Sequence, residues 1–261
     1  GRGQSWRANG VTHQGQSVSF PEQKGLIWLA GHAAWGRKAH EMGHWFKMVD
    51  IYTHKFDDGT IISGDAEFWD MAGKHDTGPV FSGHQSDLMG LFDPANVARR
   101  TWDPSAGPTN EVFEIAAHDA NEDGGARIHL LELKVAAGLS YWVEVRQQPG
   151  PVIFDANIPV PPGAAGGAQP GAVLVTRVQE EAAASNAFER PTMLFGVLST
   201  GQSAVDAARL LQIEADSVVQ ANPLVYRVVV HWNAEPPPDP NGKFDLRITP
   251  WSEETWETPD I

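Results

Sequence analysis

Cysteine is absent from this chain of 261 residues, which excludes disulfide bonds as a source of stability. Long apolar runs are also lacking. The longest lies around residues 25–30, far short of the ~20 apolar residues that a membrane-spanning helix requires. Basic residues are few and scattered, because 19 Lys and Arg stand against 33 Asp and Glu and leave a formal net charge of −14. Without a basic cluster, nucleic acid is not an expected partner.

The chain does contain enough apolar residues for a folded core, at 41% of its length, and it distributes charge and histidine unevenly. Residues 1–105 carry 12 acidic and 10 basic side chains, whereas residues 106–261 carry 21 acidic and 9 basic ones. Seven of the ten histidines lie in the first 84 residues. This asymmetry indicates two units of different character, and we place the boundary between them at residues 103–108.

The first unit holds one clear helix signal, over residues 31–48. Apolar side chains recur there at spacings of three and four, at Trp35, Ala39, Met42 and Trp45. The residues that follow, to about residue 83, are rich in turn formers and show little periodicity. We expect them to form irregular structure around a functional site.

The second unit consists of short runs with the alternation of β-strands, most of them separated by Gly, Pro, Asn or Asp. Eight such runs, with no convincing helix between them, predict an antiparallel β-sandwich. The runs cover residues 112–117, 128–135, 141–147, 172–178, 192–198, 210–215, 224–232 and 244–249. The predicted fold class is therefore α+β, with a helix-containing unit over residues 1–105 and an antiparallel β-sandwich over residues 106–261.

His40, Glu41 and His44 form an H-E-x-x-H motif inside the predicted helix. Residues at i and i+4 share one face of a helix, so both imidazoles can reach a single Zn²⁺ ion at about 2.0–2.1 Å. Glu41 points beside the metal, where it can act as general base and then as general acid. Zinc itself lowers the pKa of a bound water and polarises the carbonyl under attack. The motif therefore predicts zinc-dependent hydrolysis of peptide bonds in a protein or peptide substrate.

A catalytic zinc takes a third protein ligand, which the motif does not supply. Asp50 is the preferred candidate because it is the eleventh residue counted from His40, a spacing that resembles the extended H-E-x-x-H-x-x-G-x-x-H/D motif of metzincins. In that motif a glycine lets the chain turn back to the metal. Lys47 stands at this position here, where a left-handed conformation costs about 1–2 kcal/mol. The other candidates for the third ligand are His54, Asp65, Glu67 and His84.

A wider set of segments resembles the immune-inhibitor-A-like zinc metallopeptidases, a metzincin-like family. The matching segments are residues 40–52 with the zinc motif, 68–73 (FWDMAG), 83–93 ending in MGLFD, 141–147 (YWVEVRQ), 154–155 (FD) and 171–178 (GAVLVTRV). Of these, residues 83–93 resemble the helix that follows the zinc motif in that family. The resemblance covers roughly residues 30–180 and implies a metzincin-like zinc-helix subdomain in a secreted or cell-surface, extracellular endopeptidase. It also implies that Met71 is the Met-turn residue, an apolar floor beneath the metal ligands, with Met89 as the alternative.

One departure from that family leaves an alternative function open. Its members carry a substantial subdomain before the zinc helix, whereas 39 residues precede His40 here. Without that subdomain, a substrate has no edge strand to join. The alternative is a catalytically weak or inactive metallopeptidase-like module, with a binding or structural role in a larger extracellular protein. Residue 1 is glycine and no leader pattern follows it, so we expect either a removed leader or further domains of the same precursor.

Two weaker hypotheses concern calcium and carbohydrate. Asp57-Asp58-Gly59 and residues 119–125 (DANEDGG) offer oxygen ligands for Ca²⁺, although neither fits the spacing of a known calcium loop. Acidic hairpin turns are the simpler interpretation of both segments. The ten tryptophans favour carbohydrate binding only if Trp35, Trp45 and Trp142 are exposed, since buried tryptophan is ordinary core packing.

Overall fold

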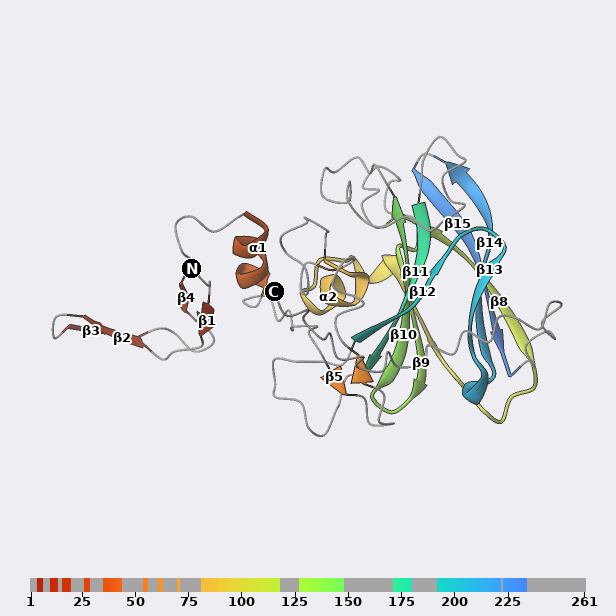
Figure 1. Cartoon of the computed structure of the whole chain (residues 1–261), viewed down its shortest axis with the longest axis horizontal. Helices are drawn as coiled ribbons and strands as arrows, with labels where there is room; N and C mark the ends of the chain where they lie inside the picture. The colour runs from red at the N-terminus through yellow and green to blue at the C-terminus, as the bar shows by residue number, and fades with distance from the viewer. Residues whose placement is uncertain are drawn as a thin grey trace, which may run out of the picture.

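The computed structural model describes two β-sheets that face each other and a set of short elements that precede them in the chain (Figure 1). The residues that it describes are 4–6, 10–13, 16–19, 26–28, 35–43, 54–55, 61–62, 70, 81–117, 127–147, 171–179, 192–221 and 223–233.

Short elements make up the described part of the first 90 residues. Three antiparallel pairs occur there: β1 (Gln4–Trp6) with β4 (Leu26–Trp28), β2 (Gly10–His13) with β3 (Gln16–Ser19), and β5 (His54–Lys55) with β6 (Ile61–Ile62). Helix α1 spans Trp35–Gly43, inside the predicted helix, whose remaining residues lie outside the described part. Helix α2 spans Gly83–Leu88, at the start of the segment 83–93 for which the family resemblance implied a helix. None of the described helices has the length and apolar character needed to cross a membrane.

The larger sheet has five strands in the order β12-β11-β10-β9-β7. Their bounds are Val97–Thr101 for β7, Leu130–Ala136 for β9, Leu139–Gln147 for β10, Gly171–Gln179 for β11 and Thr192–Leu198 for β12. The pairings are antiparallel except that β7 and β9 are parallel. The chain can return in the same direction because it passes through β8, in the other sheet, between these two strands. The predicted antiparallel sandwich over residues 106–261 did not include β7, which adds this parallel pair at the edge of the sheet.

The smaller sheet has four antiparallel strands in the order β13-β14-β15-β8. Their bounds are Thr109–Ala116 for β8, Gln202–Asp206 for β13, Leu211–Ala221 for β14 and Leu224–Trp232 for β15. Two one-turn 3-10 helices precede strands: η3 (Pro94–Asn96) leads into β7, and η6 (Ala207–Arg209) joins β13 to β14. The predicted run at 244–249 lies outside the described residues. Each of the other seven runs coincides with a strand, whereas β7 and β13 were not predicted.

The core fills the space between the two sheets. Alternate residues of each strand point into it, as expected for strands with one face on a core. The five-stranded sheet contributes Leu131, Leu133, Val135, Leu139, Tyr141, Val143, Val145, Val173, Val175 and Leu198. The four-stranded sheet contributes Phe113, Ile115, Ala204, Leu211, Ile213, Ala215, Leu224, Tyr226, Val228, Val230 and Trp232. These two sets form one continuous apolar cluster, so the coarse prediction of a β-sandwich agrees with the described structure.

The two sheets converge at one end of the sandwich. Ala117, just after β8, bridges to Val145 of β10, and the Leu224 backbone N–H donates to Oε1 of Gln147 at 2.9 Å. Gly171 lies at this junction, where an added Cβ would come within 2.6 Å of the Arg146 carbonyl oxygen. The close approach of the backbones therefore requires glycine at this position.

The outer face of the five-stranded sheet is covered as well as its inner face. Every residue of β10 and of β11 is buried, although alternate side chains point away from the core. Antiparallel sheets in a two-layer sandwich commonly leave their outer face in water. Figure 1 shows α2 lying against this sheet, on the side away from β8, β14 and β15. The five-stranded sheet is thus a middle layer, with α2 forming part of the layer outside it.

Candidate functional site

The first four residues of the H-E-x-x-H motif, residues 40–43, lie on α1. His40 is buried, with 3% of its surface exposed, and Gly43 three residues later is buried too. Met42, on the opposite side of the helix, is 50% exposed. His40 therefore faces the interior and Met42 faces solvent, as the helical period requires. Glu41 belongs to the same helix, between them.

Several of the predicted site residues lie outside the described part of the chain. They are His44, Asp50, Asp65, Glu67, Met71 and the two acidic segments 57–59 and 119–125. His54 lies on the short strand β5. Within the residues that are described, no group of three or more His, Asp or Glu side chains is arranged to hold a metal ion. Of the preferred zinc ligands His40, His44 and Asp50, the described residues include His40, and its inward position fits a ligand.

His84 and Met89, the alternative ligand and the alternative Met-turn residue, both lie on or next to α2. The His84 ring is buried, and its centroid is 5.1 Å from that of Trp142 at an interplanar angle of 55°. Met89 is the C-cap of α2, and its N–H donates to the carbonyl oxygen of Gln85 at 3.0 Å. The ring contact assigns His84 a packing role against the sheet.

Trp142 is itself buried, with 3% exposed, and its indole N–H donates to Oγ of Ser140 at 2.8 Å. It cannot serve as an exposed platform for a sugar ring. Of the three tryptophans on which carbohydrate binding depends, Trp142 is the one whose side chain the structure describes, and its burial weakens that hypothesis.

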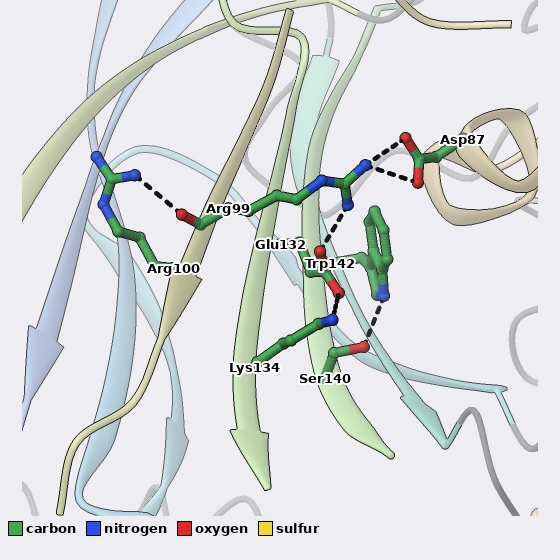
Figure 2. A network of polar contacts seen from close by, with 7 residues as sticks. All are labelled: Asp87, Arg99, Arg100, Glu132, Lys134, Ser140 and Trp142. Carbon is green, nitrogen blue, oxygen red and sulfur yellow. Dashed lines mark hydrogen bonds and ion pairs between the residues drawn. The ribbon is translucent and has the colours of Figure 1, made fainter. Parts of the chain in front are cut away.

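A polar network joins α2 to the five-stranded sheet, and sequence reasoning did not find it (Figure 2). Arg99 of β7 donates from Nη2 to both carboxylate oxygens of Asp87 on α2, at 2.8 and 3.0 Å. Its Nη1 donates to Oε2 of Glu132 on β9 at 2.6 Å, and Lys134 Nζ lies 3.6 Å from the other oxygen of Glu132. The Arg99 guanidinium also lies over the Trp142 ring, 5.8 Å from its centroid. We refer to Asp87, Arg99, Glu132 and Trp142 as the Arg99 network.

Opposing effects act on the charge of Arg99. Burial lowers the pKa of its guanidinium, but hydrogen bonds from the guanidinium to Glu132 and Asp87, together with their charges, outweigh burial and raise the pKa overall. Arginine is therefore held in its charged form here, and its guanidinium bridges two carboxylates, Asp87 through Nη2 and Glu132 through Nη1. Glu132 is 2% exposed, so its carboxylate depends on this partner more than a surface acid would.

A second acidic side chain on β10 completes the contact with α2. Oε2 of Glu144 accepts a hydrogen bond from the Gly83 backbone N–H at 2.7 Å, and Nη1 of Arg146 lies 3.5 Å from Oε1. Glu144 thereby satisfies one of the N–H groups that the first turn of a helix leaves without an intrahelical partner. Ser82 Oγ accepts from the Gln85 N–H at 3.4 Å, so two side chains cap the same short helix.

No family model, curated protein or solved structure matches the chain. Its function must therefore be inferred from its own residues. α1 presents a buried histidine within an H-E-x-x-H motif, whereas the Arg99 network and Glu144 form a junction between α2 and the sheet. The sequence contained a signal for that junction, because charged residues alternate with apolar ones along β9 and β10. The pattern alone assigns such residues to solvent, whereas the structure buries Glu132, Glu144 and Arg146 and leaves Lys134 exposed.

Proposed function

We propose that this protein is a secreted zinc-dependent endopeptidase and that α1 is its zinc helix, within a metzincin-like subdomain. One observation supports the proposal above all: His40 lies on the buried side of a helix that carries the motif, with Met42 on the exposed side. A helix that continues by one residue brings His44 to the side of His40, because i and i+4 are neighbours on a helical surface.

The proposed donor set suits zinc. His40, His44 and Asp50 would hold the ion through two imidazole nitrogens and one carboxylate, a combination that occurs in catalytic zinc sites with three protein ligands. When bound, zinc would supply a Lewis acid for the scissile carbonyl and would lower the pKa of the attacking water.

Glu41 has a separate role in the proposal. Its neighbour His40 faces the interior, so a carboxylate one residue along the helix lies beside a ligand rather than in its place. From there Glu41 accepts the proton that the nucleophilic water releases and donates it to the amine of the departing peptide. A protein or peptide is therefore the proposed substrate.

Metal analysis combined with two kinds of substitution tests this proposal. We expect purified wild-type protein to contain about one zinc per chain, as a single catalytic site requires. His40→Ala and His44→Ala should lose the metal. Glu41→Gln should keep it but hydrolyse a peptide library about 10²–10⁴-fold more slowly, the range for loss of a general base. His231→Ala is the matched control, because that imidazole contacts Asn110 and Glu214 on the sandwich and should leave zinc content unchanged.

Two results would contradict the proposal. One is a wild-type protein with far less than stoichiometric zinc. The other is hydrolysis by the wild type that Glu41→Gln leaves unaltered. Stoichiometric zinc without hydrolysis in either protein would instead support the non-catalytic module.

A further inference from the structure

The outer face of the five-stranded sheet is suited to a packed partner rather than to water. Its apolar members Val97, Leu130, Trp142 and Val178 form a buried cluster separate from the main core. Charged side chains share this face: Glu132 and Glu144 are 2% and 3% exposed. Burial of a carboxylate is unfavourable unless it is paired and hydrogen-bonded, so this face depends on the groups that pack against it.

Helix α2 makes a different contact with this face at each of three positions. Gly83 donates its N–H to Glu144, His84 packs its ring on Trp142, and Asp87 accepts two hydrogen bonds from Arg99. Gly83 also allows a close approach, since an added Cβ would clash with the Leu130 side chain. A helix of six residues is thus fixed at its first two residues and at its fifth.

We propose that this face of the sheet anchors the part of the chain that carries the H-E-x-x-H motif, with Arg99 and Glu144 as positioning residues. The inference rests on the proposed function for its zinc-binding part. α2 comes directly after residues 44–82, which hold the other two proposed zinc ligands, His44 and Asp50, and Met71. Fixing the end of that segment lowers the conformational entropy that the segment must lose when its ligands gather around a metal. The sandwich would thereby stabilise a site whose proposed ligands His40, His44 and Asp50 all precede it in the chain.

Arg99→Ala and Arg100→Ala form a matched pair for the test. The two arginines are adjacent on β7 and similarly exposed, at 47% and 44%. Arg99 pairs with Asp87 of α2, whereas Arg100 pairs with Glu111 of β8. Hydrogen exchange of the full chain provides a readout that needs no metal. We expect Arg99→Ala to accelerate exchange about tenfold at residues 84–90, and to accelerate it also at residues 35–43 of α1. Arg100→Ala should change neither segment.

Zinc affinity provides the second readout. Arg99→Ala should weaken zinc binding at least fivefold, within the usual range of coupling between sites, while Arg100→Ala should not. Arg99→Lys should restore part of both effects, because one ammonium can reach one carboxylate but cannot bridge Asp87 and Glu132 as the two guanidinium nitrogens do. A purely local role for Arg99 would alter α2 alone and leave zinc affinity unchanged.

The possible outcomes separate this inference from the proposed function. The anchoring would be overturned if Arg99→Ala and Arg100→Ala showed equal exchange at residues 84–90. It would also be overturned if Arg99→Ala accelerated exchange in α2 but changed neither exchange in α1 nor zinc affinity. If the wild type binds no zinc, the proposed function fails. Exchange at residues 35–43 then decides the anchoring by itself: acceleration in Arg99→Ala alone supports it, and no change overturns it.

Discussion

Tyr141 places a phenol in the core between the two sheets. Its hydroxyl donates to Oδ2 of Asp206 at 2.6 Å, and its ring meets Phe195 edge-on at 4.8 Å between centroids. Asp206 also accepts from Nη1 of Arg209 at 2.6 Å and from the Ala208 N–H at 3.1 Å, which fixes η6 at the end of β13. One buried hydroxyl therefore connects β10 with the turn that leads into β14.

This arrangement predicts a loss of stability at alkaline pH. Burial, and after it the negative charge of Asp206, raises the pKa of Tyr141 far above its ordinary value of 10.0. Because the raised pKa belongs to the folded state, the stabilisation is complete below about pH 10 and is lost as pH rises toward the folded pKa. Urea unfolding measured from about pH 8 to 11 should show an unfolding constant that increases by up to about tenfold per pH unit at the alkaline end. Tyr141→Phe should remove this rise of the unfolding constant with pH. If the unfolding constant of the variant rises as steeply as that of the wild type, Tyr141 is not the group responsible.

At the scale of single residues, the sequence predicted what depends on short spacings. The spacing of apolar residues predicted a helix where α1 lies, but it did not predict the buried side: Met42 belongs to the predicted apolar stripe and is 50% exposed, whereas His40 is buried. The Arg99 network could not be predicted in this way. Arg99 and Glu132 are 33 residues apart, and they meet only because β7 pairs in parallel with β9.

Gly83 determines how closely α2 can approach the sheet. An added Cβ would overlap the Leu130 side chain and lie 3.0 Å from Oε2 of Glu144, which accepts the hydrogen bond of the same residue. Either α2 or Glu144 would have to move. A single methyl group thus tests whether α2 is tightly docked.

We expect Gly83→Ala to destabilise the protein by about 1–3 kcal/mol, the usual range for overpacking. The sign of the change distinguishes the two effects. The helix propensity of alanine is about 1 kcal/mol more favourable than that of glycine, so without overpacking the substitution would stabilise the protein. Gly107→Ala is the control, since no atom lies within 4 Å of its added Cβ, and it should change stability by less than about 0.5 kcal/mol. Denaturant unfolding measures both variants. A stabilised Gly83→Ala protein would mean that α2 is not packed against Leu130.

At the scale of elements, strands with regular alternation were predictable and irregular ones were not. The predicted runs at 192–198 and 224–232 coincide with β12 and β15 residue for residue. β7 escaped prediction because Arg99 and Arg100 are consecutive and interrupt any apolar alternation. β13 escaped because only Ala204 and Val205 in it are apolar. Both strands lie at sheet edges, where pairing with one neighbour defines a strand that its own composition does not.

At the scale of the whole molecule, residues on both sides of the predicted unit boundary at 103–108 pack together in the sandwich. Trp102 follows β7 and packs on the sandwich core, while its backbone N–H donates to the Lys134 carbonyl oxygen at 2.7 Å. Its indole N–H donates to Oδ1 of Asn233 at 2.8 Å. β7 and Trp102 therefore belong with the sheets, although they precede residue 106.

This predicts how two fragments will behave. A fragment of residues 106–261 lacks β7 and the large Trp102 side chain, whose loss from a core costs about 3–5 kcal/mol, a major part of a typical domain's stability. A fragment of residues 81–261 keeps both, together with α2. We expect cooperative thermal unfolding and a near-ultraviolet dichroism signal from the longer fragment but not from the shorter one. Equal melting temperatures would contradict the assignment of β7 to the sandwich.

The position of β15 in the smaller sheet also affects how the protein is made. β15 lies between β14 and β8, and it pairs with β8 from Val225–Ala116 to Trp232–Thr109. A chain is synthesised from its N-terminus, so β8 is complete before β15, the strand with which it pairs. More than a hundred further residues are synthesised in between, which takes several seconds at about 5–20 residues per second. Until the ribosome has passed residue 232, β8 is not joined to β14, and the five-stranded sheet faces an incomplete partner. The nascent chain is then most exposed to aggregation, and a pause in translation before residue 224 would prolong that interval.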